Sequence, residues 1–244
     1  MQANTLIWVL SQVNNFKIVL INFSFNSERI FNKKNFKYPA VSNCLAGMYY
    51  NIPVKGTCAH AYIMSYQNQD IPNEFYLDDN QNKNLYHKAF EYRTELKWHT
   101  NLDELRAFCS FTRIYRENSL LLVDTYNTIH SGVKNSILVS LALNFFCPGV
   151  NIRGVRLDSG DLADLSKKSK ALVDLIADEY GNYGMKSMKI SASNDINENS
   201  LKKFNKQGHN LHILGIGTNL VTCQLQPFCY VKNEIRDVFN KFFY

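Results

Sequence analysis

The feature that most constrains the fold is an alternation of short apolar runs with helical patterns, clearest in the second half of the chain. The apolar runs predict strands, and each is followed by a turn and then by apolar residues at helical spacing. Strands are predicted at 52–56, 120–123, 152–157, 188–193 and 211–214, and helices at 137–145, 162–176 and 201–207. Strands that alternate with helices form βα units, so the sequence predicts an α/β fold with a parallel sheet.

Capping residues place several helix ends. The segment 158–161, Asp-Ser-Gly-Asp, predicts a turn followed by a helix start, and 180–182 predicts the end of that helix. Asp195 and Glu198 have the spacing of a capping box. Gly208 stands where a C-terminal glycine ends a helix.

Composition excludes several classes of protein. The chain has 244 residues, a formal net charge of +6, 45% apolar residues and 20% charged residues, which is a globular balance. The charge is spread without an arginine-rich block, which favours small anionic ligands over nucleic acid. No apolar run approaches the roughly 18 residues of a membrane helix. Six cysteines without CxxC or zinc spacing are typical of reduced thiols. We expect a cytoplasmic protein that binds neither nucleic acid nor membrane.

The chain divides into two parts by sequence character. Residues 1–37 carry no recognisable motif and form a divergent N-terminal segment of uncertain fold, with one strand candidate at 18–25. Residues 38–244 carry the repeated units and form the second domain. A closed barrel of this type needs eight strands, and about five are found. The expected architecture is therefore an irregular and incomplete (β/α) barrel.

The chemically reactive residues follow the predicted strands. They are His60, Asp124, Arg156 with Asp158, Asn194, and the Gly-Ile-Gly-Thr turn at 215–218. In open parallel sheets and in (β/α) barrels, sites form at the carboxyl ends of the strands. These residues are therefore predicted to line one polar pocket.

Each residue also has a structural alternative. Arg156 and Asp158 lie two apart on one strand, so they face the same side and suit an anionic sugar ligand, but a structural ion pair is an equal alternative. Asp124 follows an apolar strand, where a carboxylate must be paired or sit at a site. A lone histidine such as His60 is more often structural. The turn at 215–218 can present N–H groups to a phosphate, although such turns are more often only turns.

Taken together, the segments resemble nicotinate phosphoribosyltransferase over about residues 38–232. The motifs that carry the resemblance are Ser42-Asn43-Cys44-Leu45-Ala46-Gly47, Val54-Lys55-Gly56-Thr57-Cys58-Ala59-His60, Val123-Asp124-Thr125-Tyr126 with Ser131-Gly132, Gly154-Val155-Arg156-Leu157-Asp158-Ser159-Gly160-Asp161-Leu162, Ser193-Asn194-Asp195-Ile196, and Gly215-Ile216-Gly217-Thr218-Asn219-Leu220-Val221-Thr222-Cys223 with Gln226-Pro227.

The resemblance implies an irregular barrel of the type II phosphoribosyltransferase kind, a homodimer, and an enzyme of NAD salvage. Such an enzyme makes nicotinate mononucleotide and diphosphate from nicotinate and phosphoribosyl diphosphate, coupled to ATP hydrolysis. It implies Mg²⁺ bound with phosphoribosyl diphosphate and ATP, and we predict no metal-ligating residue of the chain itself.

The resemblance also assigns roles to matching positions. His60 matches the histidine that ATP phosphorylates, and Asp124 and Asp158 match carboxylates that line the ribose and diphosphate region. Thr57 and Arg156 match contacts to nicotinate. Thr218 matches a phosphoribosyl contact, on a turn shaped by Gly215 and Gly217, and Asn194 is a further predicted substrate-binding residue.

Members of this family are longer. They carry a Phe-Gly-x-Arg-Arg-Ala-Gln segment before the first motif, and residues 1–37 are unrelated to that region. We therefore expect a fragment or a truncated gene product. The alternative is a catalytically inactive remnant that binds nucleotide or a full-length subunit. Nicotinamide phosphoribosyltransferase shares the fold, but the residues of the motifs at 156–161 and 215–218 argue against assigning the chain to that family.

Overall fold

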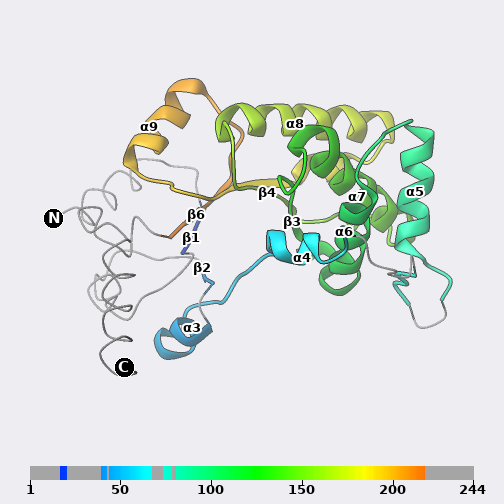
Figure 1. Ribbon diagram of the computed structural model, residues 1–244, viewed down its shortest axis with the longest axis horizontal. Coiled ribbons are helices and arrows are strands. Elements are labelled where there is room, and N and C mark those ends of the chain that lie inside the picture. Colours follow the sequence, from blue (N-terminus) through cyan, green and yellow to red (C-terminus); the bar gives the residue numbers. More distant parts are fainter. Residues whose placement is uncertain (1–16, 21–39, 43, 68–73, 79–80, 218–244) are drawn as a thin grey trace, which may run out of the picture.

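A parallel sheet organises the molecule. The structure, a computed structural model, describes residues 17–20, 40–42, 44–67, 74–78 and 81–217. Within these ranges one sheet has six strands in the order β2-β1-β6-β5-β4-β3, and all neighbours are parallel (Figure 1). The strands are β1 (Lys17–Leu20), β2 (Ala40–Val41), β3 (Leu120–Leu122), β4 (Gly154–Leu157), β5 (Lys189–Ala192) and β6 (Ile213–Ile216). This arrangement confirms the predicted α/β class.

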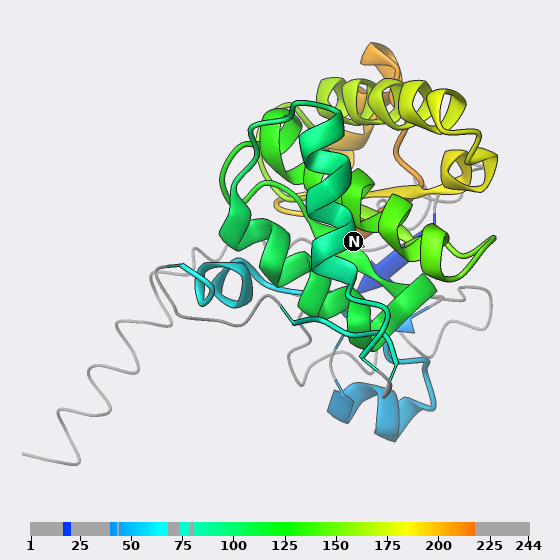
Figure 2. The same cartoon turned by 90° about the vertical axis from the view of Figure 1, so that its right-hand side faces the viewer.

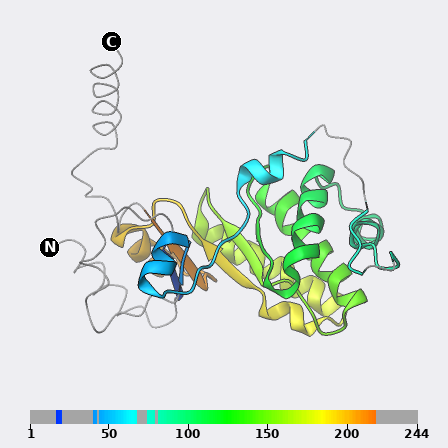
Figure 3. The same ribbon diagram turned by 90° about the horizontal axis from the view of Figure 1, so that it is seen from below.

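Helices cover the sheet unevenly. The α-helices are α3 (Cys44–Tyr50), α4 (His60–Met64), α5 (Leu85–Glu95), α6 (Leu102–Tyr115), α7 (Lys134–Phe146), α8 (Leu162–Glu179) and α9 (Glu198–Gln207). Two short 3-10 turns, η1 (Arg116–Asn118) and η3 (Tyr183–Ser187), and one π-helical segment, η2 (Thr128–Val133), complete the described part. Helices α5, α6 and α7 gather at the β3 end, whereas α8 packs over β4 and β5 (Figures 1 and 2). Figure 3 shows α3 and α9 at the opposite end of the sheet.

The core sits between the sheet and α7. Every residue of α7 from Asn135 to Leu143 is buried, which is typical of a helix surrounded by protein on all sides. Leu121 and Leu122 of β3 are fully buried in the same cluster. Removing a side chain of this size from water contributes roughly 1.5–3 kcal/mol. The strands next to the candidate site are therefore anchored in the best-packed part of the molecule.

The edge strands β2 and β3 are linked by an extended segment, 53–57. Val41 N–H donates to Pro53 O at 3.0 Å, and Lys55 N–H donates to Val41 O at 2.8 Å, which ties the segment to β2. The Thr57 hydroxyl donates to Leu120 O on β3. The predicted strand 52–56 is therefore an extended bridging segment with a single ladder bridge, at Val54. No regular strand forms there because the segment bonds to β2 at one end and to β3 at the other, and so does not run along either strand.

Most predicted elements are confirmed, with one shift that affects the site. The predicted strand 211–214 forms instead as Ile213–Ile216, so Gly215 lies inside β6 and not in the turn after it. The reason is pairing on both sides, since Gly215 is opposite Val19 of β1 and Leu214 is opposite Ala192 of β5. Only Gly217 of the predicted turn follows the strand within the described residues, and Thr218 lies outside them.

The capping box of α9 was predicted two residues too early. Asp195 has a φ of 48°, a left-handed conformation, and does not cap the helix. Asn197 is the N-cap residue, and its side chain accepts from the N–H groups of Asn199 and Ser200 at 3.0 and 3.1 Å. The predicted helix start after 158–161 is confirmed, and Asp161 is the N-cap residue of α8, since its side chain accepts from Asp164 N–H at 3.1 Å.

The N-terminal segment contributes to the main sheet. Its strand candidate at 18–25 appears as β1, which pairs with β2 and β6, and the rest of 1–37 lies outside the described residues. Across the part of the chain that the structure describes, no helix combines the length and apolar character needed to span a membrane. The four cysteines in that part, Cys44, Cys58, Cys109 and Cys147, are free thiols.

We predict that His212 makes the fold sensitive to acid. Its Nδ1 accepts from Ile190 N–H at 3.2 Å, and burial, with Lys189 and Lys170 nearby, lowers its pKa. Because the unfolded chain takes up this proton first, stability falls as the pH drops from about 6.5 to the lower folded pKa and then levels off. His212→Asn keeps an acceptor but has no group that titrates here, so it should flatten this part of the curve. Chemical denaturation between pH 5 and 8 measures it, and an unchanged pH slope in the variant would contradict the assignment.

Candidate active site

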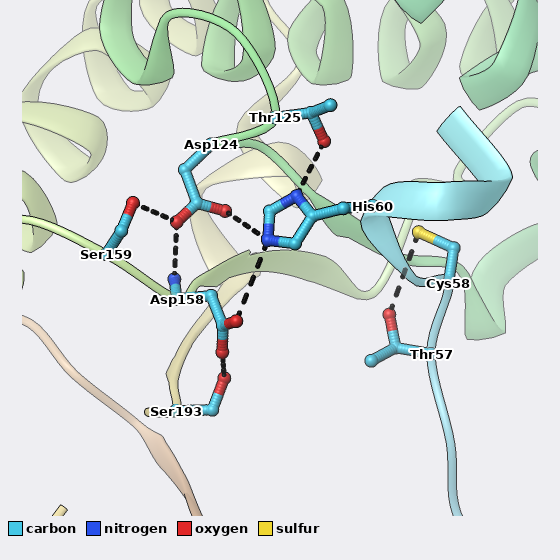
Figure 4. A network of polar contacts seen from close by, with 8 residues as sticks. All are labelled: Thr57, Cys58, His60, Asp124, Thr125, Asp158, Ser159 and Ser193. Atoms are coloured by element: carbon cyan, nitrogen blue, oxygen red, sulfur yellow. Dashed lines mark hydrogen bonds and ion pairs between the residues drawn. The ribbon is translucent and has the colours of Figure 1, made fainter. Parts of the chain in front are cut away.

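A polar cluster lies at the carboxyl ends of β3, β4 and β5. Asp124 follows β3, Asp158 follows β4 and Ser193 follows β5, while His60 reaches in from the start of α4 (Figure 4). This is where parallel sheets place their sites. The structure thus brings together the three predicted catalytic residues, which lie far apart in the sequence.

His60 is surrounded by oxygen atoms on both ring nitrogens. Its Nε2 lies 3.9 Å from Asp124 Oδ1 and 3.6 Å from Asp158 Oδ2, and its Nδ1 lies 3.0 Å from the Thr125 hydroxyl (Figure 4). A hydroxyl can donate or accept, so Thr125 is compatible with either tautomer and with the charged ring. Because 41% of the His60 side chain is exposed, a ligand can approach it.

The Asp124 carboxylate joins two strand ends. Its Oδ2 accepts from Asp158 N–H at 2.9 Å and from the Ser159 hydroxyl at 2.6 Å. Its Oδ1 is buried, has no hydrogen-bond partner among the described residues, and is the oxygen that faces His60. Asp158 is held in turn, since its Oδ1 accepts from the Ser193 hydroxyl. One carboxylate oxygen of each residue is therefore fixed by protein donors, and the other faces the histidine.

Among the described residues, Arg156 forms no ion pair with Asp158, which argues against the structural alternative left open by their spacing. Its Nε is buried and has no hydrogen-bond partner within that part of the chain. A buried N–H group without an acceptor costs free energy, which an anionic ligand would recover.

The other predicted substrate-binding residues are placed less directly. The Thr57 hydroxyl is already bonded to β3. Asn194 is exposed, has a φ of 79°, and directly follows the Ser193 that holds Asp158. Non-glycine residues in this left-handed region are uncommon and often lie at functional sites. Gly215 lies in β6 and Gly217 just after it.

Sequence reasoning missed the residues that hold the carboxylates and the histidine. Thr125, Ser159 and Ser193 each stand next to a predicted residue or one position beyond a strand end, but we assigned them no role. Short hydroxyl side chains beside strand-end carboxylates were the signal that could have found them. The neighbouring Cys58 is not an activated nucleophile, because burial raises the pKa of its thiol.

A buried acid behind the site was also missed. Glu104 on α6 is completely buried, and its Oε2 accepts from the Ser131 hydroxyl at 2.5 Å and from Asn135 Nδ2 at 2.9 Å. Burial raises its pKa to about 7, and the negative charge of Asp124 adds to this, although the two hydrogen bonds act in the opposite direction. The sequence signal was Asn101 three positions earlier, which is capping-box spacing.

The fold is similar to that of solved nicotinate phosphoribosyltransferases. The structure of human nicotinic acid phosphoribosyltransferase superposes with a TM-score of 0.71 at 24% identity, covering 88% of this chain and 45% of that chain. Nicotinate phosphoribosyltransferase from Porphyromonas gingivalis superposes with a TM-score of 0.51 at 14% identity, covering 93% and 50%. These likenesses confirm the predicted fold class.

Sequence comparison finds nicotinate phosphoribosyltransferases. The chain is 43% identical over 189 residues to that of Dictyostelium discoideum, covering 76% of this chain and 32% of the relative. It is 38% identical over 202 residues to nicotinate phosphoribosyltransferase 2 of Arabidopsis thaliana, covering 78% and 36%. No family model matches. The predicted resemblance is confirmed, and the chain spans about a third of the length of the curated relatives it matches.

We predict that Gly132 is indispensable to the site. A Cβ atom built on it would lie 1.9 Å from Val123 O, the residue before Asp124, and that carbonyl belongs to the backbone and cannot move cheaply. Gly132→Ala should therefore destabilise the protein by about 2–3 kcal/mol, as overpacking does. Gly56→Ala is the matched control, because nothing lies within 4 Å of its Cβ position. Thermal unfolding measures both, and equal stability of the two variants would contradict this packing.

Proposed function

We propose that this chain carries catalytic residues of a nicotinate phosphoribosyltransferase of NAD salvage. The reaction joins nicotinate to phosphoribosyl diphosphate, giving nicotinate mononucleotide and diphosphate, and is coupled to ATP hydrolysis. The observation that carries the proposal is His60 held between Asp124 and Asp158 at the strand ends. All three residues lie in motifs that resemble those of the family. The proposed setting is a cytoplasmic homodimer.

His60 is the proposed phosphoryl acceptor from ATP. In the tautomer with a proton on Nδ1, that proton is donated to the Thr125 hydroxyl, which leaves the Nε2 lone pair free. Attack on the γ-phosphorus forms an N–P bond as the P–O bond to ADP breaks. The ring then carries a positive charge next to Asp124 and Asp158, which stabilise it. Water later cleaves the N–P bond and releases phosphate.

The two carboxylates serve the sugar transfer. Displacement at the anomeric carbon passes through a state with oxocarbenium character, which a nearby carboxylate stabilises. Mg²⁺ bound to the substrate would neutralise the charge of the leaving diphosphate. Asp124 Oδ1, which has no hydrogen-bond partner among the described residues, and Asp158 Oδ2 could accept hydrogen bonds from water bound to that ion. The part of the chain that the structure describes contains no group of three His, Cys, Asp or Glu residues suited to a metal, so substrate and water would supply the ligands.

Substrate anions would be met by the remaining predicted residues. Arg156 suits the carboxylate of nicotinate, because its planar fork pairs with a carboxylate and its Nε lacks a partner. Thr57 is the proposed second contact to nicotinate. Thr218 is proposed to contact the phosphoribosyl group, with Gly215 and Gly217 shaping the chain before it, and Asn194 is proposed as a further substrate contact. The net charge of +6 suits three anionic substrates.

The first test is His60→Ala. The variant should lose stimulation by ATP completely, because no ring nitrogen remains to accept the phosphoryl group, while basal transfer is weakened but measurable. His87→Ala, which removes an exposed histidine of α5, is the matched control and should keep the stimulation. Nicotinate mononucleotide formation with and without ATP is the measurement.

Two outcomes of this test would contradict the proposal. Full ATP stimulation in His60→Ala would exclude the phosphoryl-acceptor role. No transfer by the unaltered protein under any condition would exclude the activity and favour the inactive remnant that binds nucleotide or a full-length subunit.

A second test concerns the pyridine substrate. Nicotinate should be used in preference to nicotinamide, and Arg156→Gln should raise the KM for nicotinate about 10- to 100-fold, the range expected for a hydrogen bond to a charged group. The matched control is Arg153→Gln, on an exposed arginine just before β4. Competition between the two pyridines measures this preference. Equal use of both, or equal effects of the two substitutions, would contradict the assignment of Arg156.

A further inference from the structure

Glu104 is a fully buried acid that the proposed reaction does not use. It lies on α6, away from the strand ends, and binds Ser131 of η2 and Asn135 of α7 through its Oε2. Ser131 and Gly132 belong to a motif that sequence analysis singled out without a role for either residue. The segment 124–133 therefore has the site at its start and the bond to Glu104 near its end.

The contacts of Glu104 differ from those of an ordinary helix cap. In a capping box, the acid at the third helical position accepts from the N–H group of the N-cap residue. Here the N-cap residue is Asn101, whose side chain accepts from Glu104 N–H at 2.9 Å, but its own N–H donates to the Ser131 hydroxyl at 3.0 Å. Ser131 then donates to Glu104. The cap of α6 therefore includes Ser131 of η2. Loss of the Glu104 carboxyl would leave the Ser131 hydroxyl without its acceptor and so loosen the contact between η2 and the start of α6.

The segment between Ser131 and the site has little freedom. The N–H groups of Ser131 and Gly132 both donate to Asn127 O, at 3.0 and 2.9 Å. Gly132 packs directly against Val123, with no room for a side chain between them. Val123 is followed by Asp124 and Thr125, which face the two ring nitrogens of His60. A displacement of Ser131 is thus transmitted to both neighbours of the histidine.

We propose that Glu104 is a positioning residue for the transferase site: by holding Ser131 and Asn135 it fixes the segment 124–133 and with it Asp124 and Thr125 against His60. The effect on catalysis rests on the proposed function, whereas the positioning of Asp124 and Thr125 rests on the contacts described above.

The role does not require a negative charge. Two buried oxygens, Glu104 Oε1 and Asn135 Oδ1, have no donor among the described residues, and a proton on Oε1 would turn one of these two acceptors into a donor. The charged group that influences Glu104 is Asp124, at the start of the segment that it holds, and Glu104 in turn helps to raise the pKa of the Tyr126 phenol on the same segment. The pKa of about 7 shows that the neutral form is readily reached. Glutamine, which matches the protonated acid in shape, should therefore replace it.

The test compares Glu104→Ala, Glu104→Gln and the control Asp103→Ala, which removes the neighbouring acid that pairs with Arg106 on the same helix. The readouts are the ¹⁵N chemical shifts of the His60 imidazole, amide hydrogen exchange over 124–132, and kcat and KM. Glu104→Ala should shift the His60 resonances, speed the exchange about tenfold and lower kcat about tenfold with KM unchanged, because the carboxyl that accepts from Ser131 and Asn135 is lost. Glu104→Gln and Asp103→Ala should behave like the unaltered protein.

Unchanged His60 resonances and exchange in a folded Glu104→Ala protein would overturn the proposal and leave Glu104 as a helix cap only. Failure of Glu104→Gln to restore them would also overturn it. If Glu104→Ala does not fold, Ser131→Ala removes the bridging hydroxyl and keeps the acid, and it must shift the same resonances. If the unaltered protein shows no transfer, the proposed function fails, while the resonances and exchange still decide whether Glu104 positions the segment.

Discussion

The side chain of Asp124 is 1% exposed, and a carboxylate in such a place is unfavourable unless its oxygens are bonded. One oxygen is satisfied by donors from the end of β4, so β3 and β4 must end side by side for Asp124 to be tolerated. The other oxygen faces His60 and has no donor. The same burial that costs stability therefore creates a site that a cation or a positively charged transition state can complete.

The surroundings of Asp124 hold it from two directions. On one side, η2 packs through Gly132 against the end of β3 and is tied to α6 by Ser131 and Glu104. On the other side, the segment that links β2 to β3 through Thr57 leads directly into His60 at the start of α4. Asp124 thus follows β3, whereas His60 follows the segment that leaves β2. The bond from Thr57 to β3 brings the two residues together. Because close-packed interiors transmit small displacements, changes in packing away from the site should alter the positions of His60 and Asp124.

The alternation of apolar runs and helices predicted the class of fold, the strands before Asp124, Asp158 and Asn194, and the convergence of His60 with the two carboxylates. This succeeded because strand ends in a parallel sheet share one edge, so position in the sequence translates into position in space. The predicted bounds of β6 were wrong. Glycine suggests a turn in the sequence, whereas pairing with β1 and β5 determines where the strand begins and ends. Glu104 was missed because its partners lie 27 and 31 residues away, a distance that local patterns do not cover.

The central claim is that His60 is the phosphoryl acceptor of this site, and mapping the phosphate tests it most directly. The protein would be incubated with Mg²⁺ and ATP labelled at the γ-phosphate, digested at alkaline pH and mapped by mass spectrometry. The account predicts one acid-labile phosphate, on the peptide that contains His60, and none in His60→Ala. Label on a different residue, or no label in a protein that nonetheless couples transfer to ATP, would contradict it.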